Sequence, residues 1–336
     1  SVLDVPMSDP AVYKSFTSTE PIGVTPEQID SKTATLGLPE MGTKFIRGVL
    51  MEAQPKNFTD LLQISGLTHG TGCWLGNAEE LINDKICTIS DVIGCRDDIM
   101  MTLIHKYGME KSLSFKIMEF VRKNKKGLVI PKEMQDAMFE HGVPQWYVDS
   151  LQKIRYMFPK AHAVAYVMMA FRIAYFKVYY PLAYYAAFFS IRAKAFDYEL
   201  MCQGRERLET TMKDYKKRLS AKQLSPKEEA AYGDMKIVQE MYARGYEFMP
   251  IDIFQAKAKH FQIIDGKLMP ALNTIDGMGD KAAEGVVEAA KDGPFTSCEN
   301  FKTRSKVSGT IVDKMREMGM LGDLPLSDQM SLLDFM

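Results

Sequence analysis

Acidic residues are missing from one long stretch of this chain, although the chain as a whole is close to neutral. Residues 151–196 contain seven Lys or Arg side chains and no Asp or Glu, whereas all 336 residues together carry a formal net charge of -1. A net charge this small argues against non-specific coating of nucleic acid. Any anionic partner is therefore expected to bind at local patches, and residues 151–196 form the clearest one.

Paired cysteines and long apolar runs are also absent. The five cysteines are scattered and no two are spaced as C-x-x-C, which favours a reducing compartment and no zinc site. Arg172, Lys177 and Pro181 divide the most apolar region into runs shorter than the roughly 18 residues of a membrane span, and no signal peptide opens the chain. These features predict a cytoplasmic protein without a membrane partner, and an apolar content of 46% is enough for real cores.

The acid-free stretch contains a proline that predicts the start of a helix. Pro159 in a first turn costs no hydrogen bond, so Lys160 and His162 are expected at the positive end of a helix that follows it. Free backbone N–H groups at such an end can hold a phosphate. Helical spacing places Tyr166 above His162. The alternative is a core helix whose few cations extend to water.

Glycine is concentrated in one short segment. Four glycines lie between Gly66 and Gly76, which allows the backbone to come close to something bound. The segment lacks the Gly-Lys-Ser/Thr ending of a Walker loop, so by itself it is also compatible with an ordinary loop.

Charged side chains elsewhere permit two interpretations each. Lys44 and Arg47, three apart on one predicted helix face, are either a solvated pair or contacts for a triphosphate. Asp97 and Asp98 are neighbours whose side chains point about 100° apart on a helix, which favours surface charge over a metal-binding pair. A basic loop is either solvated or in contact with a template strand, and it comprises Arg122, Lys123, Lys125 and Lys126.

The C-terminal half contains several start and turn signals. A charged helix is predicted over 199–219, and the capping box of Ser225 and Glu228 predicts a helix that stops near Gly245. Asp265 and Gly266 lie between two apolar runs and predict a tight β-hairpin over 261–269.

Residues 272–286 have the pattern of a helix-hairpin-helix motif. Gly277 and Gly279 allow the turn around Met278 to expose backbone N–H groups at a helix N-terminus, and Ala283 is expected to let two helices approach. Such amides bind a DNA phosphate without reading sequence, and Lys281 adds a cation. An αα-hairpin used only for packing is the alternative. Residues 307–318 are expected to form a second, degenerate half of the motif.

The ordered motifs resemble the PolC-type alpha subunit of bacterial DNA polymerase III, through residues 17–20, 37–47, 65–78, 92–100, 158–166, 172–177 and 180–182. The resemblance implies a mainly α fold, in which a helical fingers domain precedes a small β-hairpin, a helix-hairpin-helix duplex-binding domain and a flexible tail. It assigns 1–55 to the end of the palm and its connection to the fingers, 56–205 to the fingers, 206–323 to the duplex-binding domain (with the helix-hairpin-helix at about 270–320) and 324–336 to a clamp-binding tail.

The resemblance also implies binding roles for particular residues. The incoming dNTP is expected to contact Thr68, His69, Gly70, Phe158, Lys160 and His162, together with Lys44 and Arg47, and DNA is expected to contact Gly277, Met278, Gly279, Lys281, Lys123, Lys125 and Lys126. The tail resembles a sliding-clamp-binding peptide formed by Gln329, Met330, Ser331, Leu332 and Leu333. Because Leu333 stands where an aromatic is expected, either it or Phe335 is expected to fill the clamp pocket.

The expected function is DNA-templated DNA synthesis by a longer polymerase, of which this chain is taken to be a C-terminal fragment. In that family the aspartates that hold Mg²⁺ lie upstream, so the chain alone is expected to bind no metal, to contain no catalytic residue and to be inactive. The implied partners are primer-template DNA, dNTP, the sliding clamp (beta subunit) and other replisome subunits. A stand-alone DNA-binding and clamp-tethering module without a nucleotide site is the alternative, and convergence of 68–70 with 158–162 separates the two.

Overall fold

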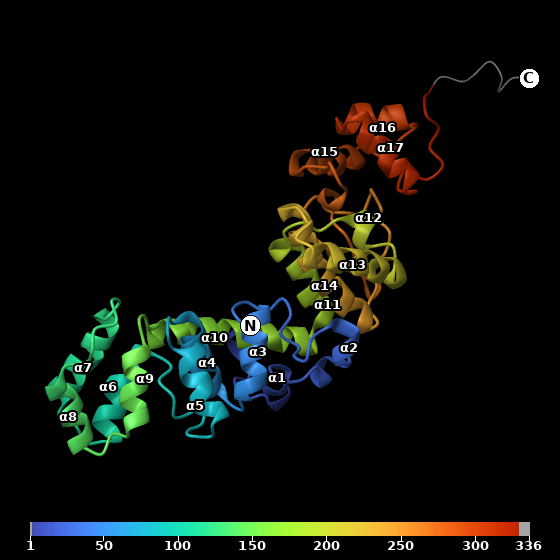
Figure 1. Cartoon of the computed structure of the whole chain (residues 1–336). Helices are drawn as coiled ribbons and strands as arrows, with labels where there is room; N and C mark the ends of the chain where they lie inside the picture. The colour runs from blue at the N-terminus through green and yellow to red at the C-terminus, as the bar shows by residue number, and fades with distance from the viewer. Residues whose placement is uncertain (1, 329–336) are drawn as a thin grey trace, which may run out of the picture. The chain divides into compact units, whose positions relative to one another are not determined.

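The computed structural model describes residues 2–328, and most of their secondary structure is helical (Figure 1). The predicted mainly α fold is confirmed, because one two-stranded antiparallel sheet is the only sheet among the described residues. No helix within 2–328 combines the length and the apolarity that crossing a bilayer requires. The α-helices are α1 (Pro10–Ser15), α2 (Pro26–Ile29), α3 (Lys44–Ala53), α4 (Phe58–His69), α5 (Glu79–Asn83), α6 (Arg96–His105), α7 (Lys111–Lys123), α8 (Lys132–Glu140), α9 (Gln145–Lys153), α10 (Lys160–Tyr179), α11 (Pro181–Ala187), α12 (Tyr198–Met201), α13 (Arg205–Ser220), α14 (Pro226–Ala243), α15 (Asp280–Lys291), α16 (Cys298–Ser305) and α17 (Gly309–Glu317).

The remaining elements are the two strands and five short helical turns. The strands are β1 (Gln262–Ile264) and β2 (Lys267–Met269), and the turns are η1 (Val2–Asp4), η2 (Glu20–Ile22), η3 (Trp74–Ala78), η4 (Phe188–Arg192) and η5 (Leu272–Thr274).

The chain divides into two compact units. The first contains the residues up to Pro26 together with Asp30–Val178, and the second contains Glu27–Ile29 together with the residues from Tyr179 onward. The division therefore falls inside the segment 56–205 that the sequence assigns to the fingers.

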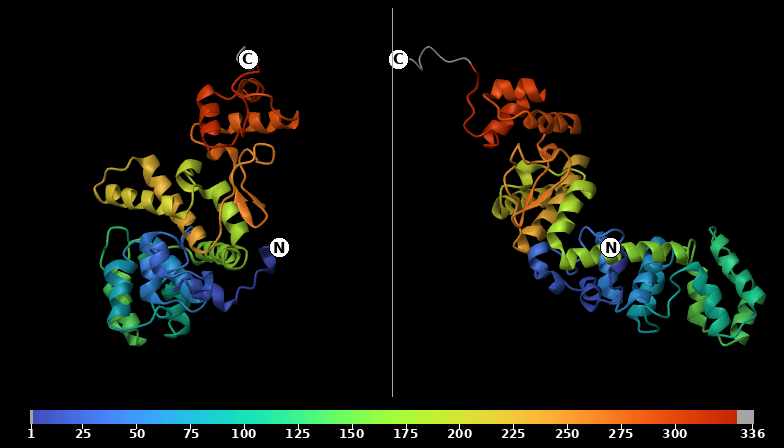
Figure 2. Two further views of the ribbon diagram at one scale, coloured as in Figure 1. Left: turned by 90° about the vertical axis from the view of Figure 1, so that its right-hand side faces the viewer. Right: turned by 180° about the vertical axis from the view of Figure 1, so that it is seen from behind.

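In the first unit, α10 is the longest helix, with 20 residues, and it runs past α3 and α4 in Figure 1 and in the right view of Figure 2. Two shorter helices begin at side-chain caps, because the Thr43 hydroxyl accepts from Ile46 N–H and the Asn57 amide accepts from Asp60 N–H. Near its other end α10 carries a buried cation. Lys177 is 1% exposed and donates from Nζ to the carbonyls of Ala34 (2.8 Å) and Leu36 (2.6 Å), which holds the loop before α3 against the helix.

In the second unit the local predictions mostly hold. The capping box is present at the start of α14, where Ser225 N–H donates to Glu228 Oε2 (2.8 Å) and Glu228 N–H donates to Ser225 Oγ (3.3 Å). The hairpin is confirmed with Gln262 opposite Met269, and its turn residues Asp265 and Gly266 have φ of 49° and 75°. The single helix predicted over 199–219 is wrong. Gly204, at φ 92°, separates α12 from α13.

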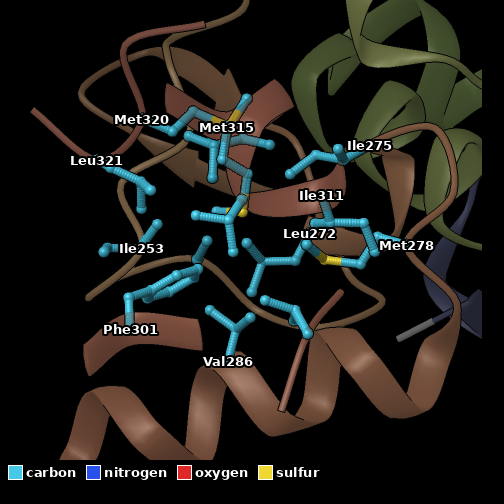
Figure 3. Close-up of a cluster of buried hydrophobic side chains, with 14 of the residues drawn as sticks. Ile253, Leu272, Ile275, Met278, Val286, Phe301, Ile311, Met315, Met320 and Leu321 are labelled. Carbon is cyan, nitrogen blue, oxygen red and sulfur yellow. The ribbon is translucent and has the colours of Figure 1, made fainter. Parts of the chain in front are cut away.

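One apolar core holds the helix-hairpin-helix region together (Figure 3). It joins η5 to α15, α16 and α17, and its fully buried members include Leu272, Val286, Phe301 and Met315. Ala283 is also buried there. Gly285 also brings α15 close to α16, because an added Cβ there would lie 2.5 Å from the Ser305 carbonyl oxygen. That Ala283 lets the two helices of the motif approach each other stays a prediction.

Candidate nucleotide and nucleic-acid site

The two segments that the sequence proposes for a nucleotide pocket meet in the first unit. Thr71 N–H donates to the Tyr156 carbonyl (2.9 Å), and Arg155 N–H donates to the Thr71 carbonyl (2.9 Å). These bonds connect the loop after α4 to the strand-like segment before α10. The His69 ring also contacts the Phe158 ring, so segments 68–70 and 158–162 converge as the nucleotide-pocket hypothesis requires.

The glycines of this loop serve the junction itself. A Cβ on Gly72 (φ 70°) would lie 2.3 Å from the Lys153 carbonyl oxygen, and one on Gly70 would lie 2.9 Å from the Tyr156 carbonyl oxygen. Within α4, Gly66 lies equally close to Gly94. Gly66, Gly70 and Gly72 thus admit other parts of the chain's own backbone, and that the glycine segment also approaches a ligand stays a prediction.

Four rings form a continuous row from the end of α4 into the first turns of α10. His69 stacks on Phe158 with ring centroids 5.2 Å apart and planes inclined at 29°. Phe158 meets His162 edge to face at 4.9 Å, and His162 meets Tyr166 in the same way at 4.7 Å. Because His162 is exposed and the other three are partly exposed, the row presents aromatic surface to solvent.

His69 is oriented by two acceptors. Its Nε2 lies 2.6 Å from Glu40 Oε2, and its Nδ1 lies 2.8 Å from the Ser65 carbonyl oxygen. The neighbouring Thr68 hydroxyl donates to the Ile64 carbonyl (2.8 Å), within its own helix. Glu40 is a residue that the sequence did not single out. Its φ of 62° shows that the loop backbone is strained there. Neither this strain nor its contact with His69, which is 29 positions away, can be predicted from the neighbouring residues.

The N-terminus of α10 is occupied by carboxylates. Lys160 N–H donates to Asp97 Oδ2 (2.9 Å), and Lys160 Nζ donates to Asp98 Oδ1 (2.6 Å). The hydrogen bond that Lys160 donates to the Asp98 carboxylate raises the pKa of Lys160. Asp98 also caps α6 by accepting from Cys95 N–H (2.9 Å), and its side chain is only 13% exposed. The interpretation of both aspartates as surface charge therefore does not hold for Asp98, which is largely covered and is the ion-pair partner of Lys160.

Lys44 and Arg47 lie on α3 as predicted but in different surroundings. Lys44 is exposed, whereas the Nε of Arg47 is buried and has no hydrogen-bond partner among the described residues. Burial lowers the pKa of the Arg47 guanidinium, and Asp30 opposes that shift. No hydrogen bond, ion pair or ring contact within 2–328 joins either cation to the ring row.

The basic run after α7 divides into two parts. Arg122 and Lys123 end the helix and pair with Glu119, at 2.6 Å and 2.9 Å. Lys125 and Lys126 are exposed in the following loop and form no ion pair within 2–328. The sequence predicted one basic loop, but only its second half is one, because Glu119 lies on the same helix face as the first half.

The helix-hairpin-helix turn belongs to the second unit. Gly277 has φ 87°, and Gly279 is the N-cap of α15 without a side chain to bind the first amides. Lys281 is exposed and has no ion pair among the described residues. Met278 is 3% exposed and packs into the core of Figure 3, so its side chain is unavailable to DNA and only its backbone can serve the predicted contact.

Two further lysines converge on this turn and were not identified from the sequence. Lys227 Nζ, from α14, lies 3.4 Å from Asp276 Oδ1, and Lys314 Nζ, from α17, lies 2.8 Å from Asp276 Oδ2. Hydrogen bonds from these lysines lower the pKa of Asp276. A cleft of about 380 Å³ is lined by this turn and by Asp197, whose pKa is raised by burial.

Two predictions remain, namely that the chain binds no metal and that its tail binds the clamp. Within residues 2–328, no group of three or more His, Cys, Asp or Glu side chains is placed to hold a metal ion. Residues 329–333, proposed for the clamp, lie outside the described residues.

Two family models match the chain. Residues 1–143 match the finger domain of the bacterial DNA polymerase III alpha subunit, and residues 245–329 match a helix-hairpin-helix motif. The first match covers α3, α4 and the loop with Lys125 and Lys126, and the second covers the hairpin turn. The chain therefore resembles the finger domain of this alpha subunit in its first part and a helix-hairpin-helix motif in its last part.

The relatives narrow this class. The chain is 50% identical over 330 residues to DNA polymerase III PolC-type of Bacillus cereus, and 49% identical over 330 residues to that of Bacillus subtilis. Each match covers 98% of this chain and 22% of the relative. The PolC-type protein of Lactococcus lactis is 48% identical over 335 residues. The chain is thus homologous to PolC-type DNA polymerase III, as its motifs indicated, and it spans about a fifth of the length of these relatives.

Proposed function

We propose that this chain acts as part of a DNA-directed DNA polymerase and supplies a pocket for the incoming dNTP. The observation that supports this most strongly is the meeting of the loop after α4 with the start of α10, which places His69, Phe158 and His162 in one row. A stand-alone DNA-tethering module would not need these two segments to converge. Exposed ring faces suit a nucleobase, and the cation at the helix start suits its phosphates.

Lys160 is the residue proposed to contact the triphosphate. Its ammonium has three donor hydrogens, and Asp98 accepts one of them. The side chain is 42% exposed, so the other two hydrogens can reach a phosphate oxygen while Asp98 keeps the ammonium in place. Asp98 therefore orients Lys160 and does not block it.

Lys160→Ala in the full-length polymerase is expected to lower kcat/KM for dNTP about tenfold or more, since a charge-assisted hydrogen bond contributes ~1.5–3 kcal/mol. Single-nucleotide incorporation at varied dNTP concentration measures this. Lys153→Ala is the matched control, because Lys153 is also half-exposed and paired, with Glu80, but lies outside the ring row. Equal kinetics for the two variants would refute the nucleotide role of Lys160.

We further propose that the hairpin turn of the second unit binds duplex DNA through its backbone amides, with Lys281, Lys227 and Lys314 as supporting cations. The helix-hairpin-helix match and the uncapped start of α15 support this proposal. Such binding is expected to be weak, independent of sequence and strongly dependent on salt.

Gly279→Ser is expected to weaken duplex binding without destabilising the protein. A Cβ at this N-cap meets nothing within 4 Å, and the serine hydroxyl would accept from the first N–H groups of α15 that a phosphate otherwise needs. Gly277→Val is the contrasting variant, because φ of 87° strains any other residue, and it should lower stability as well. Fluorescence anisotropy measures the affinity of both variants for duplex DNA, and thermal unfolding measures their stability. If Gly279→Ser binds duplex DNA as tightly as the wild type, the turn serves only to pack the helices.

Other roles follow from the family relationship and remain proposals. We propose that Mg²⁺ ions supply charge stabilisation at the reacting phosphate in the full-length enzyme and are held by residues outside this chain. The proposed partners are primer-template DNA, other replisome subunits and the sliding clamp, the last through residues 329–333, and the proposed location is the bacterial cytoplasm.

A further inference from the structure

The loop between α7 and α8 exposes two apolar side chains in the first unit. Leu128 is 61% exposed and Val129 is 74% exposed, and only Gly127 separates them from Lys125 and Lys126. Both lysines are exposed and without ion pairs in the described part of the chain. The segment 120–132 contains no acidic residue, so its charge is entirely positive. Figure 1 shows α7 and α8 at one end of this unit.

The loop backbone is held rigidly although its tip is exposed. The buried Asn124 amide donates to the Leu128 carbonyl (2.6 Å) and accepts from Leu128 N–H (2.7 Å). From the other side, the Gln152 amide donates to the same carbonyl (2.8 Å) and accepts from Ile130 N–H (2.8 Å). Four hydrogen bonds therefore fix the segment that carries Leu128 and Val129, so little ordering entropy remains to oppose binding.

We propose that this loop binds unpaired DNA, with Lys125 and Lys126 on the phosphates and with Leu128 and Val129 against the faces of exposed bases. Phosphate complements an acid-free loop with two unpaired cations. Apolar side chains beside those cations can reach base faces only where the strand is unpaired, because a duplex stacks its bases inside. A protein partner fits less well, since two side chains offer far less than the roughly 800 Å² per partner of a stable protein interface.

The test uses this chain with a labelled oligothymidine and, separately, a hairpin duplex, both titrated by anisotropy over a range of salt. Leu128→Ser with Val129→Ser is expected to weaken single-strand binding about fivefold or more, to leave duplex binding unchanged and to preserve the salt slope. Lys125→Gln with Lys126→Gln is expected to reduce the single-strand salt slope by about 1.4, because each neutralised phosphate contributes ~0.7. Leu75→Ser is the control, since Leu75 is 66% exposed in the same unit.

Wild-type single-strand affinity in the Leu128/Val129 variant would overturn the inference and would favour an acidic protein partner. Equal losses for single strand and duplex in that variant would overturn it too, because base contact would then be excluded. The double variant is expected to stay folded, since both replaced side chains are exposed. Its melting temperature, measured beside binding, distinguishes a loss of affinity from a loss of structure. The assay contains no nucleotide, so its outcome is independent of whether Lys160 serves a dNTP pocket.

Discussion

Gly66→Ala is expected to lower the free energy of unfolding by about 1–3 kcal/mol, although alanine is the better helix former. Gly66 lies within α4, where a Cβ would stand 2.2 Å from the Gly94 carbonyl oxygen and 2.7 Å from Cys95 Sγ. Both neighbours are buried, so neither can move into solvent. The helix must shift to admit the methyl group. Because α4 ends at His69, the shift should also displace that ring from Phe158.

Gly48→Ala provides the matched control in the same unit. Gly48 lies within α3, is exposed, and has nothing within 4 Å of a built Cβ. Helix propensity alone then applies, and this variant should gain up to about 1 kcal/mol. Chemical denaturation of both variants measures the contrast. A stabilised Gly66→Ala would show that α4 does not pack against residues 94–95 as described.

Lys177→Met is expected to destabilise the first unit by about 1–3 kcal/mol for each of the two buried hydrogen bonds that it removes. The carbonyls belong to Ala34 and Leu36, which are 1% and 5% exposed, so water cannot replace the ammonium. Methionine has similar length but no donor. The loop that these bonds hold leads to Glu40, which orients His69, so the variant should also disturb the ring row of the proposed dNTP pocket.

Lys153→Met tests whether burial is the cause. Lys153 Nζ likewise donates to a carbonyl, that of Gly76 at 2.7 Å, but its side chain is 49% exposed. Water can take its place, and the expected change is within about 0.5 kcal/mol. Similar losses in urea denaturation for the two variants would contradict the assigned role of the buried Lys177.

Local signals in the sequence were reliable wherever one residue dictates its own backbone. Ser225 and Glu228 form the capping box that their spacing predicts, and Asp265 with Gly266 forms the predicted hairpin turn. Gly204 shows the limit of this reasoning. The charged pattern of 199–219 continues through it, so periodicity predicted one helix, but a φ of 92° ends α12 before α13 begins.

Charge partners were the main omission from the sequence. The acid-free stretch drew attention to Lys160, but its partner Asp98 lies 62 residues earlier in the sequence, and the partner of His69, Glu40, lies 29 residues earlier. Lys227 and Lys314 both pair with Asp276, although they lie on α14 and α17, which are far apart in the sequence. Nothing in local spacing encodes such pairs, because they depend on how helices pack and not on what each helix prefers.

The order of the motifs by itself revealed the similarity to PolC-type DNA polymerase III, the helical character of the chain and the two segments that border the candidate pocket, since those depend on residue identity and short-range backbone preference. Only the tertiary structure decided what the glycines and charges of those segments do. Gly70 and Gly72 admit the backbone of residues 153–156, and Asp98 holds Lys160, because excluded volume and the cost of an unpaired buried charge act between residues that the fold brings together.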